Sequence, residues 1–307
     1  MPTQSGSQRN LGLRYTAESA FYFSLMSVLV KWAGATVPFE EIVLARTLCG
    51  LTFTWVALTR LGISPWGHRR DLLFLRGFFG FTALSCFYFA LTRLPLADAT
   101  IIQYTNPLIV AALASAILGE RLGRRDWTAM ALGLAGVIAI VQPPFLVGGP
   151  SRLPLFEVAI ASTGAFASAC AYVTVRKLGE TEDPLVVVFW FPLVSLPIAL
   201  PWGISTGYIP NMQELAILIG VGICVQVAQI RLTQGLKLEK AGRAMSMTYL
   251  QVIFATIWGI AFFNEWLNGL AALGGVSVLA GSVLLLKQPT PKAADKPGCG
   301  QFPSEDA

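Results

Sequence analysis

Apolar stretches of about twenty residues recur along the whole chain, and charged residues or glycine and proline separate them. About 20 residues suffice to cross the hydrocarbon core of a bilayer as a helix. This pattern predicts an all-α integral membrane protein. Its ten transmembrane helices are expected over residues 16–33, 40–59, 72–92, 97–118, 126–141, 154–175, 184–206, 212–233, 242–263 and 268–286.

The first five and the last five predicted helices repeat each other under a constant shift of 145 positions. Tyr104 is matched by Tyr249, and Glu120 by Glu265. Because five crossings are an odd number, the second copy enters the membrane from the opposite side. The basic residues agree, since 18 of the 22 fall on the side of the N-terminus, which predicts that both termini are cytoplasmic. The predicted organisation is a cytoplasmic N-terminal segment 1–15, inverted repeats 16–141 and 154–287, a linker 142–153 and a disordered cytoplasmic tail 288–307.

Composition narrows the functional classes. The chain is 54% hydrophobic and only 13% charged, and its mean hydropathy of +0.62 is typical of a membrane protein. The net charge of +5 comes from basic residues between the apolar stretches, where they orient helices, so no nucleic-acid partner is expected. The single histidine, His68, lies in a basic loop, and the five cysteines show no C-x-x-C spacing. We therefore expect no metal, no cofactor and no catalytic residue.

Two long motifs indicate a family. The run FYFALTRLPLADATIIQYTNPLIVAALASAILGERL and the following GLAGVIAIV resemble the EamA repeat of the drug/metabolite transporter superfamily, and SVLVKW and LARTLCGLTF are similar to its first two helices. The second copy departs where Val252 answers Pro107 and Phe191 answers Arg46. The resemblance implies a ten-helix carrier of the inner membrane with both termini cytoplasmic. Such carriers commonly export amino acids, other metabolites or drugs.

Polar side chains inside the predicted helices are the candidates for a solute cavity. Tyr104 and Tyr249 are repeat mates, and facing each other they would offer aromatic and hydroxyl groups to a polar solute. Alternatively, they hydrogen-bond neighbouring helices as part of the packing. Pro107 frees the carbonyl of Gln103 and predicts a hinge. The candidate cavity residues are Tyr104, Tyr249, Gln103, Asn106, Tyr88, Gln226, Gln229, Thr248 and Gln251.

Charged residues within or at the ends of the predicted helices form a second group of candidates. Arg46 lies deep enough to cost about 3 kcal/mol, so it either steers an anionic solute group or pairs with backbone carbonyls. Glu18 is the candidate for proton coupling, although it would also favour the positive end of the helix dipole. The remaining charges are expected to be structural or to gate the cavity: Lys31 and Arg176 as anchors, and Glu120 and Glu265 as clamps, with Arg124 or Arg125 as the partner of Glu120.

The sequence therefore predicts a monomeric secondary transporter in the lipid bilayer of the inner membrane. It would export small-molecule solutes such as amino acids by alternating access through a central cavity. Two alternatives stay open: a polyspecific cation-drug efflux carrier and a membrane-embedded enzyme. The enzyme lacks support because no H-E-x-x-H and no pair of carboxylates at membrane depth is present.

Overall fold

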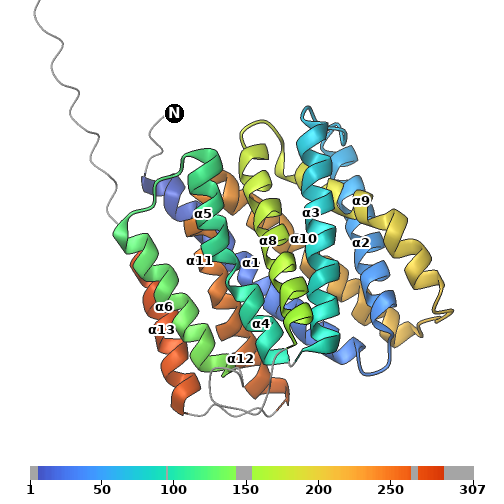
Figure 1. Ribbon diagram of the computed structural model, residues 1–307. Helices are drawn as coiled ribbons and strands as arrows, with labels where there is room; N and C mark the ends of the chain where they lie inside the picture. Colours follow the sequence, from blue (N-terminus) through green and yellow to red (C-terminus); the bar gives the residue numbers. More distant parts are fainter. Residues whose placement is uncertain (1–5, 95, 143–153, 264–268, 287–307) are drawn as a thin grey trace, which may run out of the picture.

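A computed structural model describes residues 6–94, 96–142, 154–263 and 269–286, and every regular element within these ranges is helical. The helices lie alongside one another in a bundle (Figure 1). They are α1 (Gly6–Ala33), α2 (Phe39–Arg60), α3 (Arg70–Arg93), α4 (Leu96–Tyr104), α5 (Asn106–Leu118), α6 (Arg124–Val141), α8 (Leu155–Leu178), α9 (Pro184–Ile204), α10 (Met212–Leu238), α11 (Ala241–Ser246), the 3₁₀ turn η1 (Met247–Tyr249), α12 (Leu250–Phe263) and α13 (Gly269–Leu286).

The predicted all-α membrane class is confirmed. Seven helical stretches in the described part are long and apolar enough to span a bilayer, including the combined stretches 99–118 and 241–262. Helices α1, α3 and α6 are not among the seven, because each carries several charged residues that lower its hydropathy. The count of ten therefore stays a prediction.

The helix boundaries agree closely with the predicted ones, with one clear exception. Helix α1 begins at Gly6, ten residues before the predicted start at residue 16, so most of the predicted N-terminal segment is helical. These turns are polar, with Arg9, Asn10 and Arg14, so a count of apolar residues does not detect the helix there. Helix α6 ends where the linker is predicted to begin, at Gln142, which adopts a left-handed conformation with φ of 47°. The rest of the linker and the tail lie outside the described residues.

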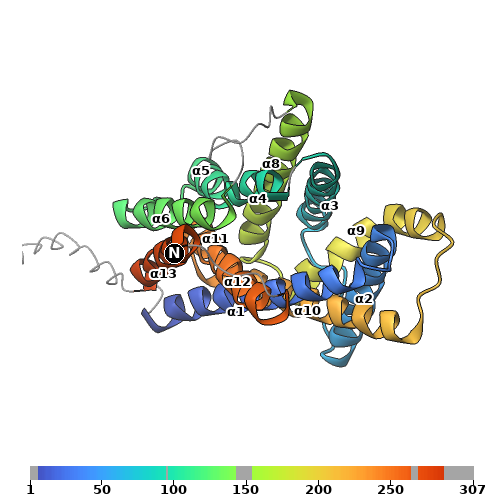
Figure 2. The same cartoon turned by 90° about the horizontal axis from the view of Figure 1, so that it is seen from below.

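Helix packing repeats under the same shift of 145 positions as the sequence. The shift relates α1 to α8, α2 to α9, α3 to α10 and α6 to α13. Accordingly, α2 packs on α9 and α6 on α13, while the contact of α1 with α10 is matched by that of α8 with α3 (Figure 2). Each contact between the copies therefore has an equivalent contact with the roles of the copies exchanged, as expected of two halves related by a twofold axis.

Small residues bring α6 and α13 together. A Cβ atom built on Gly274 would lie 2.6 Å from the backbone oxygen of Gly136. Close by, the hydroxyl of Ser277 donates a hydrogen bond of 2.9 Å to the carbonyl of Leu132. Glycines and hydroxyl side chains that allow close backbone approach are the usual basis of helix association in lipid.

Two adjacent glycines of α13 test this contact. Gly274→Ala is expected to destabilise the protein by about 1–3 kcal/mol, because the backbone of α6 cannot yield as a flexible side chain would. Gly275→Ala is the matched control, since its added Cβ meets nothing within 4 Å and alanine favours the helix by about 0.5–1 kcal/mol. Thermal unfolding in detergent measures both. Equal melting temperatures would contradict the tight contact.

Candidate functional site

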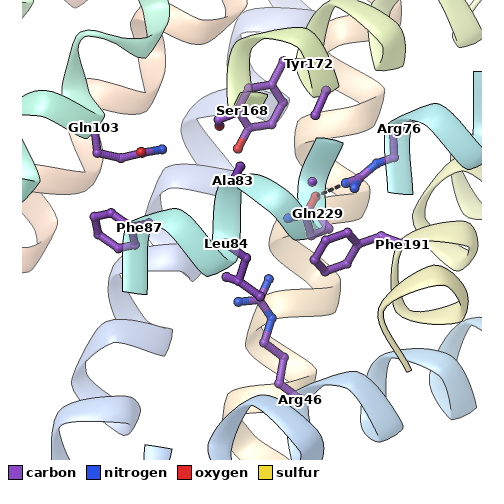
Figure 3. A pocket seen from close by; sticks show the side chains of 12 residues that line it. Arg46, Arg76, Ala83, Leu84, Phe87, Gln103, Ser168, Tyr172, Phe191 and Gln229 are labelled. Atoms are coloured by element: carbon purple, nitrogen blue, oxygen red, sulfur yellow. Dashed lines mark hydrogen bonds between the residues drawn. The ribbon is translucent and has the colours of Figure 1, made fainter. Parts of the chain in front are cut away.

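A cavity of about 150 Å³ lies where helices of the two halves meet (Figure 3). It is lined by Arg46 of α2, by Arg76, Gly80, Ala83, Leu84 and Phe87 of α3, by Gln103 of α4, by Ser168, Ala171 and Tyr172 of α8, by Phe191 of α9 and by Gln229 of α10. Polar and aromatic groups thus share the wall with aliphatic ones, which suits an amphipathic solute.

Arg76 is the most deeply buried charge in this wall, with only 3% of its surface exposed. Its Nη2 donates a hydrogen bond of 3.3 Å to the Oε1 of Gln229, and its guanidinium carbon lies 4.8 Å from the ring centroid of Phe191. Gly80, one turn further along α3, gives the side chain room, since a Cβ there would lie 2.6 Å from Nη1. The Nε atom of Arg76 is buried without a hydrogen-bond partner.

Arg46 reaches the same aromatic ring from α2. Its guanidinium carbon lies 5.6 Å from the centroid of Phe191 (Figure 3). Arg46 and Phe191 occupy equivalent positions in the two copies, so this contact joins the two halves. No carboxylate is among the lining residues, and within the described ranges no ion pair involves Arg46 or Arg76. The cavity is therefore strongly positive.

Three of the predicted site residues, Gln103, Gln229 and Arg46, line this cavity. The predicted tyrosine pair does not. Tyr104 and Tyr249 contact each other, with ring centroids 6.1 Å apart, and the Tyr249 hydroxyl donates a hydrogen bond of 3.2 Å to the carbonyl of Tyr104. Both pack in an apolar cluster, and Tyr249 is 1% exposed. These contacts correspond to the packing alternative, and a role of the pair in solute binding stays a prediction.

The other predicted cavity residues make local or interhelical contacts. The buried side chain of Gln226 donates to the carbonyl of Gly50 (3.1 Å), and that of Asn106 donates to the carbonyl of Ala165 (3.0 Å), so both tie helices together. Thr248 donates to Met245 within its own turn, and Gln251 is half-buried at the start of α12. The side chain of Tyr88 lies outside the described residues.

The hinge predicted at Pro107 coincides with a helix break. Helix α4 ends at Tyr104, and Pro107 is the second residue of α5. The second copy is interrupted just before the equivalent position, in the 3₁₀ turn η1, although it has no proline there. In both breaks a threonine hydroxyl, of Thr105 or Thr248, donates to the carbonyl three residues back (2.6 Å each). Similar bonds occur inside unbroken helices, as for Ser24 of α1, so they accompany the break in the second copy and do not account for it.

The charged ends of the helices are paired differently from the prediction. Glu120 does not pair with Arg124 or Arg125: its Oε1 accepts from the Nε of Arg176 at 2.9 Å. Its Oε2 accepts from the backbone N–H of Ala241 at 2.8 Å. Arg176 is therefore a partner of Glu120 and more than an anchor. Nearness in sequence alone favours the arginines of the α5–α6 loop.

Glu18 also has cationic partners, Arg14 at 2.9 Å and Arg231 at 3.3 Å. Lys31 lies exposed in the last turn of α1, and Glu265 lies outside the described residues.

Sequence reasoning misses Arg76, together with Ser168, Tyr172 and Phe191. Arg76 falls among the basic residues that orient helices, because it is near the start of its predicted span. Its position six residues inside α3 is the available signal, since an arginine inside a span needs a specific environment.

A comparison with protein families identifies the family of this chain. A model of the EamA-like transporter family matches the chain twice, over residues 11–142 and 155–287. The chain belongs to the EamA-like transporter family. The resemblance noted in the sequence is thereby confirmed, and the two matches coincide with the two copies of the repeat.

Relatives of this EamA-like protein carry transporter names. It is 28% identical to the pseudopaline exporter CntI of Pseudomonas aeruginosa over 275 residues, which are 89% of this chain and 95% of that one. It is 32% identical to mouse solute carrier family 35 member G1, covering 83% of this chain and 72% of that one. The riboflavin transporter of Rhizobium johnstonii is 24% identical over 90% of this chain and 91% of that one.

A solved crystal structure shares the fold, with a TM-score of 0.75 and 20% identity over 92% of this chain and 96% of that one. The family match and the transporter names of the relatives show that the EamA-like protein is a multi-pass membrane transport protein and not an enzyme.

Proposed function

We propose that this EamA-like protein is a secondary transporter of the inner membrane. It exports small metabolites such as amino acids by alternating access through the cavity of Figure 3. The observation that carries the proposal is the position of that cavity. Its wall combines α2, α3 and α4 of the first copy with α8, α9 and α10 of the second, so movement of one half against the other would change its access.

In this proposal the chain crosses the membrane ten times. The seven apolar stretches are joined by α1, α3 and α6, whose packing partners α10, α8 and α13 belong to the apolar set. Five crossings per copy would give the inverted repeat, and the distribution of basic residues supports a cytoplasmic position of both termini. The protein would work as a monomer, because one chain supplies the whole cavity wall.

Gln103, Gln229 and Arg46 would contact the solute directly. Tyr104, Tyr249 and Pro107 would act at the helix breaks, where the two halves meet and can bend. Export as the direction is supported by the name of the Pseudomonas relative, and a small organic solute by the name of the riboflavin transporter. The two arginines in the cavity wall argue against the alternative of cation-drug efflux.

Metabolite profiles of medium and cytosol test the proposal. Cells that express the protein should enrich one or more small metabolites in the medium and deplete them from the cytosol, relative to cells with the empty vector. The purified protein in liposomes should then exchange the same metabolites. No difference in either profile, with the protein present in the membrane, would refute export.

Proton coupling through Glu18 can be tested separately. Glu18→Gln should make flux in liposomes independent of an imposed pH gradient, because an amide cannot carry the proton. Solute exchange without a gradient should persist. A variant that keeps the gradient dependence would exclude Glu18, whose contacts with Arg14 and Arg231 would then be structural.

A further inference from the structure

We infer that the cavity binds an organic anion, with a carboxylate or a similar oxyanion held between Arg46 and Arg76 and the remainder of the solute against the aromatic and aliphatic wall. The inference rests on the proposed transport function and specifies the chemical class of its solute.

The first step is the balance of charge. A guanidinium group is always protonated in proteins, so this wall carries two positive charges. Buried charges are normally paired, because desolvation without compensation is costly. The described partners of Arg76 are neutral, namely the side-chain oxygen of Gln229 and the face of Phe191. A bound anion would supply the missing compensation.

The second step is geometry. Both guanidinium carbons lie within 6 Å of the centroid of the Phe191 ring, and both arginines line the same cavity, so a solute in that cavity has both within reach. The planar fork of arginine fits the two oxygens of a carboxylate. Arg76 retains donor capacity, because among the described residues its guanidinium donates one hydrogen bond, from Nη2 to Gln229, and the group has five N–H donors. Gly80 leaves room for the guanidinium group that a larger residue would displace.

The third step is position. Arg46 and Phe191 are repeat mates, and the wall combines both copies, so the two arginines lie at the boundary between the halves. A solute that is to be reached alternately from two sides has to bind at such a boundary. The apolar neighbours Leu84 and Phe87 and the polar Gln103 complete the wall. They favour an amphipathic acid over a bare inorganic ion.

The test compares Arg76→Gln with Arg70→Gln on the same helix, where Arg70 is exposed and outside the cavity wall. Metabolite profiles of medium and cytosol identify the exported solutes. The expected result is that these carry a carboxylate or another oxyanion. Arg76→Gln should lower their flux about tenfold or more, as expected when a charge-assisted bond is lost, while Arg70→Gln exports like the wild type.

Thermal unfolding is a second measurement, and it distinguishes an arginine that binds solute from one that stabilises the fold. Arg76→Gln should leave the melting temperature unchanged or raise it, because it removes an uncompensated buried charge. Exported solutes without an anionic group would overturn the inference. So would undiminished flux in Arg76→Gln, or a strong loss of melting temperature in that variant. Failure of the proposed function is a different result, since then no solute distinguishes wild-type cells from the empty vector.

Discussion

Arg243→Met is expected to lower the free energy of unfolding by about 3–5 kcal/mol, because it would leave two buried carboxylates without their cation. The Arg243 side chain is 4% exposed, and its Nε lies 3.1 Å from the Oδ1 of Asp126, which is 6% exposed. Its Nη1 lies 3.4 Å from the Oε1 of Glu239, and its Nη2 donates to the carbonyl of Leu285 at 2.9 Å. One side chain thus ties α11 to α6, α13 and the end of α10.

Two comparisons separate this network from a general effect of removing charge. Arg14→Met breaks the exposed pair with Glu18 and should cost less than about 1 kcal/mol. The double variant Arg243→Met/Glu239→Met should be more stable than Arg243→Met alone, because one of the stranded carboxylates has gone. Unfolding in detergent, followed by circular dichroism, measures all three. Equal losses in Arg14→Met and Arg243→Met would refute the network.

Much of this architecture follows from simple sequence patterns. The lengths of the apolar stretches predict most helix boundaries, because the thickness of the hydrocarbon core sets the length of a spanning helix. The shift of 145 positions matches Tyr104 with Tyr249, and the structure brings their rings into contact. The features that the sequence does not predict have physical causes. Helix α1 begins early in polar turns that pack on the end of α10, where Gly12 lies against Leu238 and Glu239, a tertiary contact that hydropathy does not reveal. The break at η1 lacks the proline that signals its counterpart in the first copy, so no local residue pattern predicts it.

Charged partners are the least predictable feature. Glu120 pairs with Arg176, 56 positions away in the other copy, although Arg124 and Arg125 are its neighbours in sequence. Ion pairs depend on tertiary placement, which a local pattern does not encode. The role of Arg76 in the cavity wall is not predicted for a related reason. The positive-inside rule assigns every basic residue near a helix end to orientation, and only the packing of α3 against α9 and α10 distinguishes this one.

Removing the Glu120–Arg176 pair is expected to have the second large effect, a change in access to the cavity. Glu120, just beyond α5 of the first copy, binds both the end of α8 and the start of α11 in the second. Arg176 adds a hydrogen bond of 3.0 Å to the carbonyl of Lys237. With both termini cytoplasmic, as proposed, these contacts join the halves at the cytoplasmic end. Arg176→Gln should therefore favour the state that is open to the cytoplasm.

A single cysteine in the cavity can report this opening. Ser168→Cys, in a background whose native cysteines are replaced by serine, places a thiol in the cavity wall. Loss of a charge-assisted hydrogen bond is worth about 1.5–3 kcal/mol, so labelling by an impermeant maleimide from the cytoplasmic side should become about tenfold faster in Arg176→Gln. Lys177→Gln is the control, an exposed neighbour on the same helix. Unchanged labelling in Arg176→Gln would mean that the pair does not restrain the halves.

The repeat extends this prediction to the other end of the molecule. Lys31 is the repeat mate of Arg176, and the proposed inversion would put it at the opposite membrane face. If equivalent charged residues restrain the two ends in turn, weakening one restraint should favour opening of its own side only. Lys31→Gln should then slow the labelling of Ser168→Cys from the cytoplasm and speed it from outside, the reverse of Arg176→Gln. Changes in the same direction in both variants would indicate general loosening of the bundle and would contradict alternating closure.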